Sequence, residues 1–410
     1  MSSSKWQPVW LILTLIILGL NLRPSMAAIG PLLEAIRTSL PLSYSSLALL
    51  TMLPVMTMGV AMFIGAKLAA KLGERQTLLL SLLLIGLANL ARLWAGSGLQ
   101  LLLTAIIAGL GIALIQALLP GMIKRSYSQH IERYMGIYVT AIMGGAALAA
   151  AISPWLEHRF GHWQSALAFW ALLSLPAMLF WFWGKHGLQP LGFNKAAAKK
   201  TSGKPGVSPS VGIGSFSRIP RAWLLGLFFG LSTASYTCVL AWLAPFFIDL
   251  GWQATQAGLL LAFLTLMEVV AGLLLPTLAA RSHDRRPLLL LLLLSTIGGF
   301  IGLALMPLAQ PWLWAALLGI GIGGLFPLSL IVTLDHLDDY NQAGQLTAFV
   351  QGIGYLLASL SPLLAGYLKD SSSSFTLSWL LLAAVSMGML AIAWRFDPKR
   401  HSQHFALLAQ

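Results

Sequence analysis

The chain has 410 residues, of which 58% are apolar and only 9% are charged, and its mean hydropathy is +0.81. Soluble domains carry about 25% charged residues, so this composition excludes an ordinary water-soluble protein. Lys and Arg outnumber Asp and Glu by 25 to 12, and the single cysteine, Cys238, excludes a disulfide framework and a thiolate metal site.

Long uncharged stretches separate short charged clusters along the chain. Each stretch has about 20 residues, which is enough for an α-helix to cross a bilayer. The first stretch lacks a small-residue cleavage site, so we expect it to remain as a span. The sequence predicts an all-α membrane protein with twelve transmembrane helices, at 8–37, 44–66, 77–95, 99–122, 134–156, 163–184, 222–248, 255–280, 287–306, 311–334, 345–368 and 375–395.

The basic residues predict the orientation of these spans, because Lys and Arg collect on cytoplasmic loops. With both termini in the cytoplasm, most basic residues fall inside, and only Arg37, Arg92, Arg159 and Lys369 fall outside. Topology therefore explains the net charge of +13 without nucleic-acid binding. Short loops with this bias are typical of the bacterial inner membrane.

Residues 185–221 interrupt the pattern, since they are polar, basic and rich in Gly and Pro. Such a composition predicts a flexible cytoplasmic linker. We therefore expect a six-helix N-terminal half at 1–184, a six-helix C-terminal half at 222–395 and a cytoplasmic tail at 396–410.

The two halves share an internal repeat. Lys71 and Arg75 in the loop after span two recur as Arg281 and Arg285 after span eight, at an offset of 210 residues, and 109–111 recur as 319–321 at the same offset. Parallel six-helix repeats are typical of transporters in which one half rocks against the other. Four span-ten glycines with Pro327 are expected to be packing positions: Gly319, Gly321, Gly323 and Gly324.

The loop at 66–75 resembles the signature between spans two and three of the major facilitator superfamily. Lys71, Gly73 and Arg75 fit it, while Ala66 and Ala70 stand where Gly and Asp are usual. Within that superfamily the chain is similar to the cyanate porter group, which is described as taking up cyanate and has nitroimidazole transporters as relatives. The similar segments are 19–24, 30–33, 119–125, 283–286 (with Asp284 and Arg285) and 351–354.

Two charged residues, Arg23 and Glu268, are predicted at the middle of spans one and eight. A charge there costs at least about 2.5 kcal/mol, so it needs a reason. Arg23 would supply the permanent positive charge for an anionic substrate. Pro24 should kink the helix there, and the kink could bring Asn21 to the same cavity. The alternative is a static Arg23–Glu268 pair that locks the halves together.

Three interpretations remain open for Glu268. It is a proton carrier, because desolvation disfavours the charged carboxylate, or a gate partner of Arg23, or a buried neutral acid bonded to a neighbouring helix. Its counterpart at the 210 offset is Met58, so the acid is not part of the repeat.

Polar residues complete the candidate substrate site. In the resembled superfamily, spans 1, 4, 7 and 10 with parts of 2, 5, 8 and 11 line the cavity, which points to Gln116, Tyr138, Tyr236 and Gln351. Gln351 directly precedes glycines that permit close backbone approach. Each of the four could instead form an interhelical hydrogen bond.

Asp335, Asp338 and Asp339 are expected to pair with Arg281 or Arg285. No metal-ligand spacing or cofactor motif is found, and we expect a monomer without a cofactor.

Three functions compete. The first is a secondary transporter of a small anion such as cyanate, driven by protons or by the anion's own gradient. The second is drug–proton antiport. Two residue patterns count against it: Ala105 occupies the position where many proton-coupled exporters have Arg, and Gly144-Gly145 occupies the position of the antiporter Gly-Pro motif. The third is a membrane-embedded enzyme, which would need an acidic or histidine cluster and a sizeable loop domain.

Overall fold

The computed structural model describes residues 7–126, 131–183, 213–279, 281–282, 284–337 and 340–400. Every regular element in these ranges is a helix, and twelve segments are long and apolar enough to cross a membrane. The predicted fold class and number of spans are confirmed.

The first six spans come from residues 7–183. Spans one and six are each divided into short helices, whereas spans two to five are nearly continuous. Their elements are α1 (Gln7–Leu20), α2 (Pro24–Ala27), η1 (Gly30–Leu32), α3 (Leu33–Ser39), α4 (Tyr44–Leu72), α5 (Glu74–Ala91), η2 (Arg92–Trp94), α6 (Gly98–Ser126), α7 (Ile131–Phe160), α8 (Trp163–Ala168), η4 (Phe169–Leu173) and α9 (Ser174–Trp183).

The last six spans are single helices. Pro220 and Pro311 each occupy the first position of a helix, where the missing N–H costs nothing. The elements are η5 (Ile213–Arg218), α11 (Pro220–Asp249), α12 (Ala254–Ala279), α13 (Arg286–Leu305), α14 (Pro311–Leu334), α15 (Tyr340–Ser372), α16 (Thr376–Trp394) and η6 (Pro398–Arg400). Most of the predicted linker, 185–212, and the end of the predicted tail, 401–410, lie outside the described residues.

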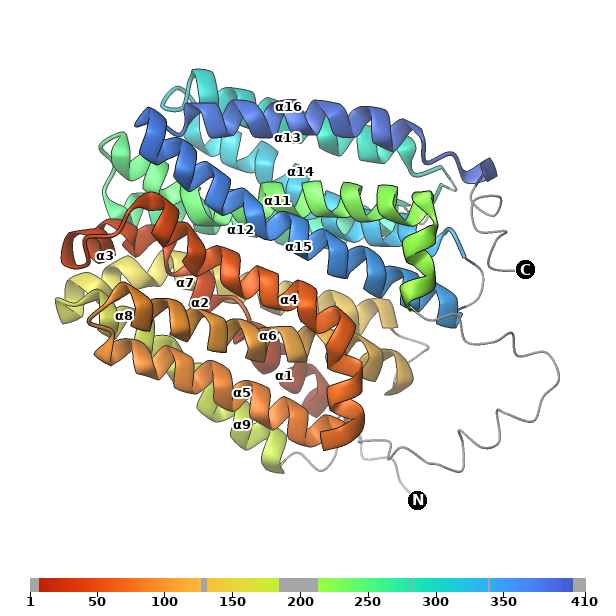
Figure 1. Ribbon diagram of the computed structural model, residues 1–410, viewed down its shortest axis with the longest axis horizontal. Helices are drawn as coiled ribbons and strands as arrows, with labels where there is room; N and C mark the ends of the chain where they lie inside the picture. Colours follow the sequence, from red (N-terminus) through yellow and green to blue (C-terminus); the bar gives the residue numbers. More distant parts are fainter. Residues whose placement is uncertain are drawn as a thin grey trace.

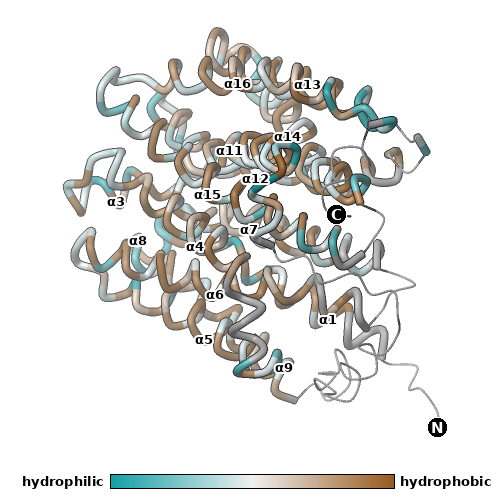
Figure 2. Tube along the Cα trace, turned by 45° about the vertical axis from the view of Figure 1, so that its right-hand side comes forward, coloured by the Kyte–Doolittle hydropathy of each residue, from teal (hydrophilic) through white to brown (hydrophobic). Residues whose placement is uncertain are grey.

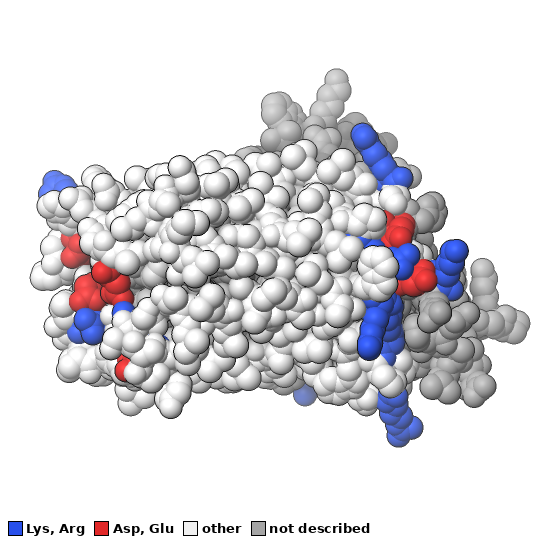
Figure 3. Space-filling view, turned by 90° about the horizontal axis from the view of Figure 1, so that it is seen from above, with Lys and Arg blue, Asp and Glu red and all other residues white. Residues whose placement is uncertain are grey.

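The helices run along the long axis of the molecule, with the N-terminal six spans below and the C-terminal six above in Figure 1. The helix shafts are apolar and polar residues gather toward the ends, as Figure 2 shows. In the face drawn in Figure 3, charged side chains form two groups at opposite ends, separated by a broad uncharged belt. An uncharged belt of this kind is typical of a protein surface that contacts the hydrocarbon of a bilayer.

The end at which α1 begins and α16 ends is called the inner end below, following the predicted orientation (Figure 1). The opposite end, where α3 leads into α4, is called the outer end.

Two pairs of helices join the halves, α4 with α15 and α7 with α12. Glycines allow the close approach. A Cβ at Gly59 would lie 3.0 Å from the carbonyl oxygen of Gly352, and one at Gly258 would overlap the carbonyl oxygen of Ala150. The halves are therefore in backbone contact along two seams. The close approach expected at Gly352 is confirmed, since a Cβ there would overlap the ring of Phe63.

Candidate substrate site in the centre of the bundle

Span one is broken where its charged residue lies. α1 ends at Leu20 and α2 begins at Pro24, so Arg23 occupies the N-cap position of α2. Proline has no N–H to continue the helical ladder, which explains why the break falls here. A Cβ at Gly145 would lie 2.5 Å from the carbonyl oxygen of Leu20, so this glycine lets α7 pack against the broken segment. The kink expected at Pro24 is thus an interruption of the helix.

The side chain of Arg23 is 4% exposed and lies between the two halves. Its guanidinium carbon is 5.2 Å from the centroid of the Tyr236 ring on α11, and Nη1 is 3.9 Å from the sulfur of Met26. A cation over an aromatic ring is worth about 0.5–2 kcal/mol. Nε has no hydrogen-bond partner among the described residues. This buried cation therefore retains unused capacity to bind an anion.

A small cavity lies beside Arg23. The centre of a water molecule can reach a volume of about 40 Å³ in it. A single water needs about 10–15 Å³ by the same measure, so there is room for a few waters or a small ion. Span one and helices α7, α11, α12 and α14 contribute the lining residues: Arg23, Val139, Met143, Ser232, Thr233, Tyr236, Glu268, Gly272, Ile322, Gly323, Phe326 and Pro327.

Several buried polar atoms around this cavity lack a hydrogen-bond partner within the part of the chain that the structure describes. They are the hydroxyls of Ser232 and Tyr236, both carboxyl oxygens of Glu268 and Nε of Arg23, and the hydroxyl of the nearby Tyr138 shares this state. Buried polar groups are normally paired, so a cluster of unpaired ones needs a specific explanation. A ligand or water in the cavity would supply the missing partners.

Arg23 is the electrostatic centre of this group. It interacts electrostatically with Tyr138, Tyr236, Tyr355 and Glu268, which come from α7, α11, α15 and α12. Across the described residues, no ion pair or hydrogen bond joins Arg23 to Glu268. The two charged groups line one cavity without touching, which leaves space between them for a third group.

Glycines of α14 place Glu268. A Cβ at Gly323 would overlap the Cα of Glu268, and one at Gly319 would lie 2.5 Å from the carbonyl oxygen of Leu264. These contacts hold α14 against α12, so Glu268 is fixed at the cavity wall with 3% of its surface exposed. The packing role expected for the glycines of span ten is confirmed.

Asn21 has a different place from Arg23. Its amide nitrogen donates to the carbonyls of Ile17 at 2.8 Å and Leu173 at 3.0 Å, and its amide oxygen accepts from the hydroxyl of Ser174 at 3.0 Å. The side chain thus connects the end of α1 to span six and does not line the cavity. The break at Pro24 does not bring Asn21 and Arg23 together.

The remaining predicted residues divide into two groups. Tyr236 lines the cavity and Tyr138 lies near it, whereas Gln116 on α6 and Gln351 on α15 are not among the lining residues. The buried amide oxygen of Gln116 has no partner among the described residues.

Sequence reasoning missed Ser232, Thr233, Met143, Phe326 and Tyr355. Helical periodicity contained a signal for two of them, since residues four apart lie on the same face of a helix. Ser232 lies four residues before Tyr236, and Tyr355 lies four residues after Gln351. The apolar residues Met143 and Phe326 carried no comparable signal.

The loops after spans two and eight lie at the inner end. Gly73 has a positive φ of 83°, which allows the tight turn between α4 and α5, and Lys71 is exposed. Arg75 donates to the carbonyl of Phe182 at 2.8 Å and so ties α5 to α9. In the second half, Arg281 is exposed, and the expected pairing of Asp335 is confirmed by its 3.0 Å contact with Arg285. Asp338 and Asp339 lie outside the described residues.

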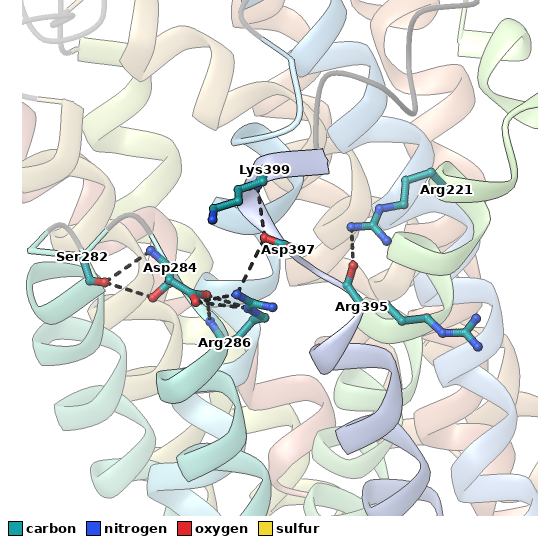
Figure 4. A network of polar contacts seen from close by, with 7 residues as sticks. All are labelled: Arg221, Ser282, Asp284, Arg286, Arg395, Asp397 and Lys399. Atoms are coloured by element: carbon teal, nitrogen blue, oxygen red, sulfur yellow. Dashed lines mark hydrogen bonds and ion pairs between the residues drawn. The ribbon is translucent and has the colours of Figure 1, made fainter.

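A further network at the inner end joins α13 to the segment after α16. Arg286 contacts the carboxylates of Asp284 at 2.9 Å and Asp397 at 3.7 Å, as Figure 4 shows. Arg221, at the start of α11, donates to the carbonyl of Arg395 at 3.0 Å. The inner ends of α11, α13 and α16 are thereby held together within the C-terminal half.

Comparison with known proteins identifies the family. The sequence model of the Major Facilitator Superfamily matches residues 9–359. The chain belongs to this family. It is 39% identical to the cyanate transport protein CynX of Escherichia coli strain K12, over 96% of this chain and 98% of that protein. It is also 30% identical to the 2-nitroimidazole transporter of the same organism, over 92% and 93% of the two chains.

Solved structures agree at the level of the fold. The crystal structure of a D-xylose–proton symporter superposes with a TM-score of 0.74 at 16% identity, covering 95% of this chain and 98% of that one. Family and fold together make the chain a multi-pass membrane transporter of the Major Facilitator Superfamily and not an enzyme.

Proposed function

We propose that this transporter carries a small monovalent anion, with cyanate as the first candidate, across the bacterial inner membrane by alternating access. Its similarity to a protein named for cyanate transport, along nearly the full length of both chains, supports the substrate class. Both termini are then cytoplasmic, as the distribution of basic residues predicts, and the working unit is a monomer.

The central observation is the buried cation at the cavity. Among the described residues, Nε of Arg23 and the hydroxyls of Ser232 and Tyr236 are buried donors without partners, and they line a cavity in which the centre of a water molecule can reach only about 40 Å³. A small anion supplies the negative charge and the acceptor atoms that these groups lack. Hydrogen bonds to a charged group contribute about 1.5–3 kcal/mol each, so two or three of them give useful affinity.

Glu268 is assigned to coupling and gating. This residue lines the same cavity, and its carboxyl oxygens have no hydrogen-bond partner in the described part of the chain, so an anion at Arg23 would lie close to a carboxyl group. Two negative charges in a buried site repel each other, and binding of the anion then favours protonation of Glu268. This linkage would couple anion movement to a proton in the same direction.

Uptake by purified protein in liposomes tests the proposal. Radiolabelled cyanate should enter protein-containing vesicles faster than empty ones. An inwardly directed proton gradient, with the outside more acidic, should drive accumulation above the external concentration. Equal entry into empty and protein-containing vesicles would contradict the assignment of a cyanate transporter.

A nitroimidazole is the second candidate substrate, because the 30%-identical relative is named for one. The aromatic and apolar lining from Phe326, Ile322 and Met143 could contact a flat ring. Competition separates the two candidates. If cyanate is the substrate, excess unlabelled cyanate should inhibit cyanate uptake more strongly than 2-nitroimidazole does. The reverse result would favour the nitroimidazole.

A further inference from the structure

Arg92 is a second buried cation in the N-terminal half, away from the cavity lining. It follows α5 in the short helix η2 and is only 1% exposed. The charge pattern placed it among the few basic residues on the outer side, yet its side chain points into the protein. A charged side chain that is buried in a membrane protein needs a reason for its cost.

Three neutral oxygen atoms surround its guanidinium group. Nε donates to the hydroxyl oxygen of Thr104 at 3.2 Å, and Nη1 donates to the amide oxygen of Asn89 at 3.2 Å and to the carbonyl oxygen of Ser25 at 3.0 Å. The hydroxyl of Thr104 gives its own proton to the carbonyl of Leu101, so its oxygen is free to accept. No carboxylate lies within ion-pair distance of Arg92 in the described part of the chain.

The contact with Ser25 is the informative one. Ser25 lies within α2, the four-residue helix that starts at Pro24 and has Arg23 at its N-cap. After this helix the α-helical hydrogen-bond pattern ends. The N–H of Ile29 donates to the carbonyl of Met26, three residues before it, and not to the carbonyl of Ser25, four residues before it. The Ser25 carbonyl can therefore accept a hydrogen bond from a side chain, and Arg92 donates this bond. So short a helix has little stability of its own and depends on such tertiary contacts.

We propose that Arg92 is a positioning residue of the substrate site, which holds α2 and thereby sets the place of Arg23. This role of Arg92 rests on the proposed function of Arg23 as the anion-binding group. Arg92 reaches the broken span from η2, and its planar group also donates hydrogen bonds to Asn89 and Thr104. Because no carboxylate of the described residues pairs with it, its charge also adds to the positive potential at this segment, which favours an anion.

Uptake kinetics provide the first test. Arg92→Gln should raise the KM for cyanate about tenfold, as expected for the loss of one hydrogen bond to a charged group, and should leave the maximal rate within about twofold. Arg92→Lys keeps the charge but loses the planar fork, and should give a smaller rise in KM. Thr104→Val is the matched control, since it removes one contact of Arg92 and leaves the bond to Ser25; its KM should stay near that of the wild type.

A substrate-independent measurement separates this proposal from the proposed function. In a Cys238→Ala background, Ser25→Cys places a thiol on α2, and its rate of alkylation by a small maleimide reports how firmly α2 is held. We expect Arg92→Gln to raise this rate severalfold and Thr104→Val to leave it unchanged. If the wild type does not carry cyanate, the proposed function fails while the alkylation assay still tests the role of Arg92.

Clear results would overturn the proposal. Unchanged alkylation of Cys at position 25 in Arg92→Gln would show that Arg92 does not hold α2. If Arg92→Gln does not fold, Arg92→Lys replaces it, and equal KM values and alkylation rates in Arg92→Lys and Thr104→Val would reject the positioning role. If Arg92→Gln and Thr104→Val raise the KM and the alkylation rate by the same factor, Arg92 has only a general packing role.

Discussion

The centre of the bundle and its outer end both lie between the two halves, but their polar groups differ in whether they have hydrogen-bond partners. At the centre, Arg23, Glu268 and Tyr236 are buried with polar atoms that have no partner in the described structure. At the outer end, Asp370 on α15 accepts hydrogen bonds from the backbone N–H groups of Tyr44 at 3.0 Å and Ser45 at 2.9 Å, and from the Ser45 hydroxyl at 2.5 Å.

The contacts of Asp370 join the halves. Its carboxylate, from the C-terminal half, caps the first turn of α4 in the N-terminal half, where the helix dipole favours a negative charge. Lys369, the residue before it, binds Asp249 at 2.5 Å, and its ammonium group lies 5.4 Å from the centroid of the Tyr44 ring. Polar groups at the outer end are thus used to hold the two halves together.

The comparison separates two uses of polar residues in one interface. Groups that stabilise a conformation have their partners in the protein. Groups that bind a transported molecule lack partners in its absence, because a fully paired site would have to lose its internal bonds before it could bind anything. The following predictions test this division.

The largest effect is expected for Arg23→Gln. Loss of two hydrogen bonds to the anion, at about 1.5–3 kcal/mol each, should lower the uptake rate by about a hundredfold or more. The melting temperature should stay the same or rise, since the change removes a buried charge that has no paired carboxylate among the described residues. Uptake in liposomes and thermal unfolding in detergent measure the two quantities. Arg23→Lys, which keeps the charge and loses the fork, should retain uptake with a weaker affinity.

Wild-type uptake by Arg23→Gln would remove this residue from the substrate site. The double variant with Glu268→Gln sharpens the outcome, because a structural lock between the two residues predicts that the second change restores transport. We expect no recovery, since the two groups do not touch.

Glu268→Gln should affect coupling more than binding. Without a titratable carboxyl at the cavity, accumulation driven by a pH gradient should disappear, while exchange of labelled for unlabelled anion down its gradient should persist. Measuring both in the same vesicles makes exchange the internal control. Accumulation that depends on the pH gradient as strongly in the variant as in the wild type would exclude a proton-carrying role.

Asp370→Asn should have a moderate effect at the outer end. The variant loses the charge that caps α4 across the interface, so the equilibrium should move about tenfold toward the state that is open on the outside. Alkylation of a cysteine introduced at Ser46, whose hydroxyl pairs with Ser43 of the same half, would measure the exposure of this seam in the Cys238→Ala background. Asp249→Asn is the control, because its ion pair with Lys369 stays within one half. Equal alkylation rates in both variants and the parent would contradict a latch at Asp370.

The smallest effect is expected for Arg37→Gln, also at the outer end. Arg37 pairs with Glu34 at 3.1 Å on the same short helix, and the two side chains are 40% and 43% exposed. Exposed ion pairs contribute about 0–1 kcal/mol, so transport and the melting temperature should change little. A change in the alkylation of the same introduced cysteine as large as that caused by Asp370→Asn would mean that pairing within one half matters as much as pairing across the interface.

The sequence determined the secondary structure to a large extent, because a bilayer imposes simple rules. A helix satisfies its backbone groups internally in hydrocarbon, and about 20 largely uncharged residues are long enough to cross it, so composition alone marked the twelve spans. The ends of α14 coincide with the prediction, while α4 extends beyond it to Leu72, since a helix can continue past the hydrocarbon. Arg23 and Glu268 were marked for the same reason, as charges where hydrocarbon disfavours them.

What surrounds these charges was decided by tertiary structure. Hydropathy does not encode which face of a helix meets which neighbour. The sequence could not show that Asn21 turns toward Leu173 and Ser174, that Tyr355 of α15 comes close to Arg23, or that Glu268 shares the cavity without contacting Arg23. Likewise, the distribution of basic residues assigned Arg92 to the outer side, and the sequence carried no prediction for Asp370. Their roles arise from contacts with Ser25 and with Tyr44 and Ser45, more than 60 and 300 residues away in the chain, and only the packing of helices brings such groups within hydrogen-bond distance.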